Sequence, residues 1–199
     1  MKQRVIQGVL VMMLIALTGC GINNLPTYDE AVTAAWSEVS NQYQRRADLV
    51  PNLINVVQGS ADYERSVLNE VVEARTRATQ TQLPADMLTN PEAFKQFQAV
   101  QDQLSSALSR LLVVVERYPD LKANQNFLTL QTQIEGVENR IAVARRDYIQ
   151  AVQRYNTEIR TFPGRIWHSI LYSDMQPKQQ FTVAEEVQQV PNVEFNFKQ

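Results

Sequence analysis

A chain of 199 residues is long enough to form one domain with its own hydrophobic core. Its 19 Lys and Arg residues nearly balance 21 Asp and Glu residues, so the chain lacks the basic surface that nucleic-acid binding requires. One cysteine and one histidine exclude an internal disulfide and a tetrahedral zinc site made from these two residue types.

The first twenty residues are organised like a bacterial secretory signal. A positive start, MKQR, precedes an apolar run over residues 8–17, and Leu-Thr-Gly-Cys follows. The run is too short for a membrane-spanning helix, which needs about 20 residues. Because Leu-Thr-Gly-Cys resembles the bacterial lipobox, we expect a signal peptide over 1–19, cleavage between Gly19 and Cys20, and lipid on Cys20. The alternative is an uncleaved anchor with an incidental cysteine.

Lipid on Cys20 is expected to hold the mature protein on the extracytoplasmic side of a membrane, because two or three acyl chains anchor stably. Gly21, in place of Asp, follows the cysteine. The lipoprotein sorting rule then implies the outer membrane, facing the periplasm, if the host has two membranes. Residues 20–27 (CGINNLPT) contain Pro26 and are interpreted as a short tether.

Three amphipathic helices are predicted next. The first covers residues 28–59, and Pro51 should kink it. Its apolar stripe recurs every seven residues, at Trp36, Tyr43, Val50 and Val57. A second helix is expected over 61–80 and, after a loop, a third over 91–118, with Asn90 as its N-cap.

The strongest periodicity lies in a final long helix. One row of residues spaced by seven contains Phe127, Ile134, Ile141, Tyr148, Tyr155 and Phe162. The sequence therefore predicts an all-α fold, an antiparallel bundle of about four long helices over 28–163. An intermolecular coiled coil is the competing arrangement, but the apolar rows are wider than a two-stranded seam needs.

The remaining residues, 164–199, are interpreted as an irregular C-terminal tail that starts with a short amphipathic helix over 164–172. Aromatic residues continue to the end of this tail, at Phe181, Phe195 and Phe197. They either pack back on the bundle or form an exposed binding patch, and packing back is the favoured alternative.

Two segments resemble the LemA family. The first is AWS at 35–37 together with RRADLVPNL at 45–53, and the second runs from ERYPDLKAN at 116–124 through ENRIA at 138–142 to ARRDY at 144–148. With VVEAR at 71–75, YNT at 155–157 and Phe162-Pro163, the resemblance covers most of residues 28–163.

The resemblance implies a bundle of long antiparallel helices outside the cytoplasmic membrane and no established enzymatic activity. Genes of the family often neighbour genes of membrane proteases, so the resemblance implies a link to envelope quality control. The sequence departs from the family in two places. A lipobox replaces the usual N-terminal membrane helix, and Ile149 stands where Asn often follows the tyrosine.

Arg46 interrupts an apolar helical row, and a buried arginine needs a carboxylate partner. The candidate partners are Glu138, Asp48 and Glu73. The candidate polar cluster comprises Arg45, Arg46, Asp48, Asn52, Glu138 and Arg140. It is interpreted either as an internal ion pair that sets helix register, which we favour, or as a pocket for an anion or peptide terminus.

A second candidate is the polar turn that contains Tyr118, Asp120, Lys122 and Asn124. It is interpreted equally as a capped helix connection and as a loop that binds a partner. His168 has no second histidine or cysteine near it, and no catalytic, metal or phosphate-binding motif occurs.

We therefore expect a non-enzymatic protein without cofactor or metal. The first hypothesis is a lipid-anchored envelope protein that acts through protein contacts, with a membrane protease among the candidate partners. The second is a ligand- or peptide-binding bundle with a polar pocket around Arg46.

Overall fold

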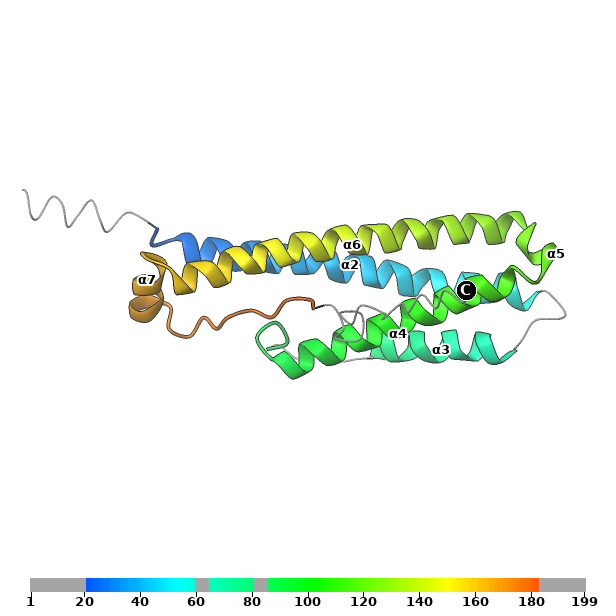
Figure 1. Ribbon diagram of the computed structural model, residues 1–199, viewed down its shortest axis with the longest axis horizontal. Coiled ribbons are helices and arrows are strands. Elements are labelled where there is room, and N and C mark those ends of the chain that lie inside the picture. The colour runs from blue at the N-terminus through cyan, green and yellow to red at the C-terminus, as the bar shows by residue number, and fades with distance from the viewer. Residues whose placement is uncertain (1–20, 60–64, 81–85, 183–199) are drawn as a thin grey trace, which may run out of the picture.

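The computed structural model describes residues 21–59, 65–80 and 86–182, and all helical elements in these ranges are shown in Figure 1. They are α2 (Asn24–Gln58), α3 (Arg65–Gln80), α4 (Pro91–Val115), α5 (Pro119–Lys122), α6 (Gln125–Arg160) and α7 (Gly164–Leu171). The all-α prediction is confirmed. Within these ranges, a helix with the length and apolar character of a membrane span does not occur. Gly19, Cys20 and the expected signal peptide lie outside the described residues.

Helix α2 begins at Asn24, before the expected start at Tyr28, so the tether predicted through residue 27 is too long. Pro26 lies in the first turn, where a missing backbone N–H removes no helical hydrogen bond. Leu25 is fully buried and extends the apolar stripe toward the N-terminus. The helix also continues through Pro51 to Gln58.

Asparagine side chains cap the N-termini of α4 and α6. The Asn90 side chain accepts hydrogen bonds from the backbone N–H groups of Glu92 and Ala93, as its predicted N-cap role requires. Asn124 does the same for Asn126 and Phe127 at the start of α6. Helix α4 ends at Val115, earlier than predicted, and the short helix α5 forms the connection to α6.

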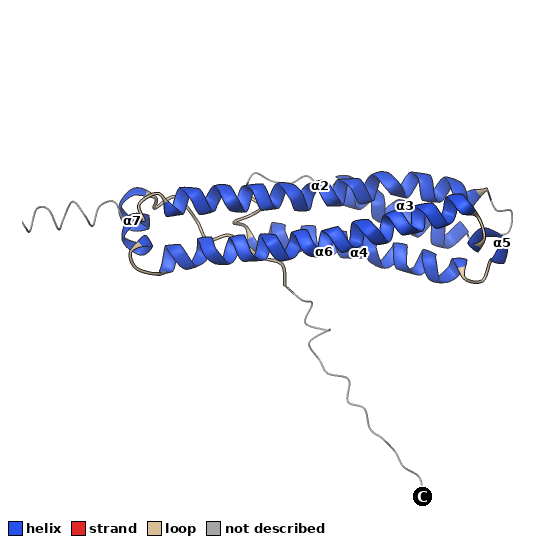
Figure 2. Ribbon diagram, turned by 90° about the horizontal axis from the view of Figure 1, so that it is seen from above, coloured by secondary structure: helices blue, strands red, loops and turns tan. Residues whose placement is uncertain are grey.

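The two longest helices form the backbone of the molecule. Helices α2 and α6 lie side by side over their whole length and run in opposite directions (Figures 1 and 2). Helices α3 and α4 form a shorter second pair, which covers α2 and α6 only toward the end where α5 lies. The molecule is therefore a long rod that is thicker at its α5 end.

Two hydrophobic clusters fill this rod. Toward the α5 end, the core is mostly aliphatic and includes Val50, Leu53, Leu104, Leu111 and Phe127. Toward the α7 end, the core is rich in aromatic residues and includes Tyr43, Phe94, Phe97, Tyr148 and Phe181. The seven-residue spacing of the sequence thus marks core positions of α2 and α6. Phe162, the last member of the predicted α6 row, is the exception, because α6 ends at Arg160 and Phe162 is exposed.

The chain beyond α7 returns along the rod in an extended conformation as far as Thr182 (Figure 1). We call residues 173–182 the docked segment. Phe181 in this segment is buried, and its ring packs against the rings of Trp36, Phe94 and Tyr148. Phe181 therefore packs back on the bundle, as expected. Phe195 and Phe197 lie outside the described residues. The helix expected over 164–172 is present as α7.

Candidate functional site

Arg46 lies inside the bundle, on α2, with 1% of its surface exposed. Its Nη1 atom donates to Glu138 Oε1 at 2.9 Å and to the Ser105 hydroxyl. Its Nη2 atom donates to both the side-chain and the backbone oxygen of Gln101, at 2.7 and 3.1 Å. The guanidinium also lies 5.0 Å from the Tyr43 ring centre. A buried charge with this many partners is strongly held.

Glu138 is the carboxylate that balances this charge, and its side chain keeps 35% of its surface exposed. The ion pair therefore connects the interior to the surface of α6. Of the three partners considered from the sequence, only Glu138 reaches Arg46. Asp48 is exposed and accepts a hydrogen bond from Gln44, and Glu73 pairs with Arg77 on α3.

The polar cluster expected from the sequence is thus not one site. Arg45 is exposed on α2, and the exposed Arg140 donates to Gln42 at 3.3 Å. Asn52 lines a shallow depression toward the α5 end, with Asn55 and Asn126 among its neighbours. Side chains one or two positions apart on a helix point in different directions, so neighbours in sequence such as Arg45, Arg46 and Asp48 do not form one site.

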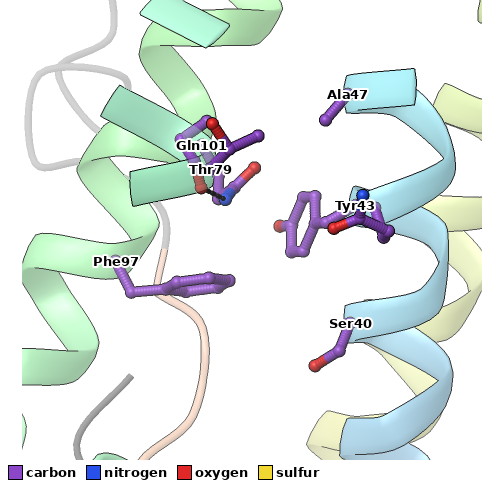
Figure 3. Close-up of a pocket in the computed structure, with 8 residues that line it drawn as sticks. Ser40, Tyr43, Ala47, Thr79, Phe97 and Gln101 are labelled. Carbon is purple, nitrogen blue, oxygen red and sulfur yellow. Dashed lines mark hydrogen bonds between the residues drawn. The ribbon is translucent and has the colours of Figure 1, made fainter. Parts of the chain in front are cut away.

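A cavity of about 160 Å³ lies beside the arginine (Figure 3). Ser40, Tyr43 and Ala47 of α2 form one wall, and residues of α3 and α4 form the other. The residues of this second wall are Ala78, Thr79, Phe97 and Gln101, and Gln44 completes the lining. Arg46 is not among the lining residues, but Gln101 contacts both the cavity and the guanidinium.

Two hydroxyl groups in this wall are chemically unusual. The hydroxyls of Ser40 and Tyr43 are buried and have no hydrogen-bond partner among the described residues. Burial raises the pKa of Tyr43 above its usual value of 10, and the nearby charges of Arg145 and Arg46 only partly oppose this shift. Tyr43 therefore stays neutral and offers a donor to a small polar molecule. No group of acidic, His or Cys side chains suited to a metal ion occurs in the described ranges.

The turn between α4 and α6 forms the far end of the rod, opposite the end where α2 begins (Figure 1). We call residues 118–124 the distal turn. Asp120 and Lys122 are exposed, and Lys122 pairs with the exposed Glu116. Asn124 caps α6, so one of the two interpretations of this turn, a capped connection, is correct for that residue. Asp120 lies in the first turn of the short helix α5.

The distal turn also borders a depression of about 400 Å³. Its lining combines Asp120, Leu121 and Asn124 with Asn55, Val56 and Gly59 of α2 and its end, and with Asn126. The depression that contains Asn52 adjoins it and measures about 430 Å³. This end of the rod thus offers exposed amide groups around a small apolar floor.

The docked segment is held by side chains that the sequence did not single out. The Tyr148 and Tyr155 hydroxyls donate to the backbone oxygens of Gln179 and Gln176, at 2.8 and 3.1 Å. Asn156 donates to the Lys178 oxygen and accepts from the Lys178 N–H. The two tyrosines in the apolar row could have indicated this contact from the sequence, because a buried tyrosine hydroxyl usually finds a hydrogen-bond partner.

His168 takes part in the same region. Its Nε2 atom lies 2.9 Å from the backbone oxygen of Met175, just after α7. Lys178 forms an ion pair with Asp29 of α2 at 2.8 Å. These contacts give the histidine and the lysine a role in holding the docked segment.

Comparison with known proteins gives one family and several relatives. A sequence model of the LemA family matches residues 35–195. Magnetosome protein MamQ 2 of Paramagnetospirillum magneticum is 27% identical over 175 residues, which cover 80% of this chain and 64% of that protein. Magnetosome protein MamQ of Magnetospirillum gryphiswaldense is 24% identical over 157 residues, 71% of this chain and 58% of the relative.

A third similar protein carries the family's own name. Protein LemA of Metamycoplasma hominis is 24% identical over 140 residues, which cover 70% of this chain and 60% of that protein. The chain thus spans roughly three fifths of the length of the curated relatives it matches.

Proposed function

This chain belongs to the LemA family, and on that premise we propose that it is a lipid-anchored protein of the cell envelope that acts, without catalysis, through protein contacts at its distal turn. Lipidation is inferred from Cys20, the single cysteine, which follows a signal-like apolar run. The residue after it, Gly21, favours the periplasmic face of an outer membrane in a host with two membranes.

The observation that carries the proposal is the position of the distal turn relative to residue 21. Helix α6 has 36 residues, and at about 1.5 Å per residue it is roughly 54 Å long. Helix α2 begins at one end of this length, and the distal turn, which contains α5, lies at the other (Figure 1). A lipid on Cys20 therefore leaves the distal turn exposed far from the anchor, where a partner can reach it.

The chemistry of the distal end suits contact with another protein. Asp120 and Lys122 offer charges, and the two adjoining depressions offer amide groups from Asn52, Asn55 and Asn126. A small apolar floor with polar groups around it resembles a protein interface, which has an apolar centre and a polar rim. The family's association with genes of membrane proteases makes such an envelope protease the first candidate partner.

Photo-crosslinking in native membranes tests this proposal. A photoreactive residue replaces Lys122 in one variant and Arg146, on the side of α6, in the control. The two positions are matched because both side chains are exposed and each forms one exposed ion pair, with Glu116 and Asp147 respectively. The mass of the purified protein reports lipidation independently.

A single recurrent adduct from position 122 that is absent from position 146 supports the proposal. Equal adducts from both positions, or none from either while the protein is abundant and lipidated, contradict contact through the distal turn. A mass that corresponds to an unmodified Cys20 contradicts the lipid anchor.

The cavity beside Arg46 supports a second candidate, the binding of a small polar molecule. Its basis is the pair of buried hydroxyls, Ser40 and Tyr43, that face this space. Native mass spectrometry of protein purified from its own envelope tests it. A bound small molecule that disappears in Ser40→Ala, and persists in Ser37→Ala at an exposed position of the same helix, supports binding. If the unaltered protein and both variants differ in mass only by the substituted atoms, no bound molecule depends on Ser40, and this result contradicts the second candidate.

A further inference from the structure

Helix α7 and the turn before it expose an apolar stripe. Ile166 and Ile170 are spaced by four residues, so they lie on one side of this short helix, and Phe162 lies in the turn just before it. Their exposed fractions are 44%, 67% and 77%. Leu171 is also exposed and extends the stripe. Single exposed apolar residues are ordinary in a folded protein, but a continuous row of large ones marks a contact surface.

Helix α7 lies at the end of the rod where α2 begins (Figure 1). Gly21 is so close to Pro163 that a Cβ atom on it would lie 3.4 Å from the proline ring. Asn24, at the start of α2, donates to Glu158 Oε1 at 3.1 Å. The start of α2 is thus fixed against the turn that leads into α7, so Gly21, the first described residue, lies beside this turn.

Charges of both signs surround the stripe, and the two arginines among them lie next to it in sequence. Arg160 and Arg165 are exposed on either side of Phe162, and neither forms an ion pair with a described residue. The nearby acidic groups are Glu158, which accepts the Asn24 hydrogen bond, and Asp174 after α7. Arginines beside an apolar row are typical of helices that lie in the headgroup layer of an anionic membrane.

We propose that the α7 stripe inserts into the surface of the lipid bilayer in which Cys20 is anchored, and so fixes the orientation of the rod on the membrane. This inference rests on the proposed lipid anchor, because the anchor brings the stripe to the bilayer and makes insertion an intramolecular step. Flexible acyl chains alone leave the rod free to tilt, whereas a second contact at the same end restricts it.

A second copy of the chain is the competing occupant of this stripe. Four side chains, three of them on a helix of eight residues, are a small surface beside the roughly 800 Å² per partner that a stable interface buries. The bilayer needs no such area, since the anchor already holds the protein there. The membrane is therefore the occupant that the geometry favours.

Fluorescence quenching in vesicles tests the proposal with the full-length, lipidated protein. Cys20 is the single cysteine, and lipid attached to its sulfur blocks reaction with a thiol probe. An environment-sensitive fluorophore is attached to Ile170→Cys or to the control Val113→Cys. Val113 is matched because it is an apolar residue with 70% exposure, on α4 and toward the distal turn. The vesicles contain phosphatidylethanolamine and phosphatidylglycerol, with nitroxide-labelled lipid as the quencher.

The label at position 170 is expected to be quenched at least about two-fold more than the label at position 113, with a blue-shifted emission, because it lies at the acyl boundary. Equal quenching of both labels in protein whose mass shows the lipid overturns the inference and leaves the proposed anchor intact. A blue shift at 170 without quenching by lipid also overturns it, because a second copy then covers the stripe. A mass without lipid refutes the anchor itself.

Discussion

Arg46 on α2 and Glu138 on α6 meet inside the bundle, 92 positions apart in the sequence, with 2.9 Å between Nη1 and Oε1. These two helices share the largest contact in the molecule and run in opposite directions. A shift of one helical turn separates the two groups by about 5.4 Å, which leaves the arginine buried and its charge unbalanced. The pair therefore selects one register of α2 against α6.

Substitution of Arg46 is expected to destabilise the protein more than substitution of Glu138. Arg46→Ala should lower the free energy of unfolding by about 3–5 kcal/mol, because it empties a buried site and leaves its polar partners unsatisfied. Glu138→Gln should cost about 1–2 kcal/mol, because the amide oxygen still accepts one hydrogen bond. Urea unfolding measures both. The control is Glu73→Gln, which breaks an exposed pair and should cost less than about 0.5 kcal/mol. Equal losses for all three contradict the assignment.

The hydroxyl of Tyr43 should contribute nothing to stability. Because it has no partner among the described residues, Tyr43→Phe is expected to leave the free energy of unfolding unchanged or raise it by up to about 1 kcal/mol. Tyr155→Phe is the matched control, since its hydroxyl donates to Gln176, and should lose about 1 kcal/mol. A clear loss for Tyr43→Phe would instead indicate that a bound molecule accepts this hydrogen bond.

The docked segment should loosen when its amide partner is removed. Asn156→Ala deletes both hydrogen bonds to the backbone of Lys178, at 2.8 and 2.9 Å. Amide hydrogen exchange in residues 176–182 is expected to accelerate roughly ten-fold or more, from about 1 kcal/mol for each lost bond. Exchange within α6 should change little. Asn139→Ala, at an exposed position of the same helix, should leave the segment unaffected.

Substitutions of Asn124 and Asp120 should distinguish helix capping from contact with a partner. Asn124→Ala removes the acceptor for two backbone N–H groups of α6 and should cost about 1 kcal/mol, with recovery in Asn124→Ser. Asp120→Asn removes an exposed charge and should leave thermal stability unchanged. If the distal turn contacts a partner, Asp120→Asn weakens the crosslink from position 122. Unchanged crosslinking in Asp120→Asn argues that this carboxylate makes no contact.

Strong alkali should destabilise the aromatic end of the rod. Burial raises the pKa of Tyr148 and Tyr155 well above the usual value of 10, and desolvation likewise raises that of Tyr43. A raised pKa means that the neutral form stabilises the fold. This contribution is complete below pH 10 and declines as the pH rises above it, because only the unfolded chain ionises readily. Tyrosine absorbance should therefore show a late phase that coincides with loss of helical circular dichroism. Tyr148→Phe should reduce the amplitude of that phase.

Much of the fold could be predicted because its signals are local. The seven-residue spacing identifies the buried rows of α2 and α6, since side chains three or four positions apart share a helix face whatever the helix contacts. Asn90 and the proline after it mark the start of α4 in the same way, because a cap bonds to its own first turn. The start of α2 was misplaced because Pro26 was interpreted as a break, although a first turn tolerates proline.

Other features depended on which helices meet. From the sequence, Asp48, Glu73 and Glu138 were equal candidates for Arg46, and only the pairing of α2 with α6 selected Glu138. The docked segment likewise packs against helices that are distant in sequence, so Tyr148, in an ordinary apolar row, gains the Gln179 carbonyl as its partner. Periodicity determines which face of a helix is buried, because that is set by the helix itself. The partner of a buried polar group is set by contacts distant in sequence, which only the tertiary structure decides.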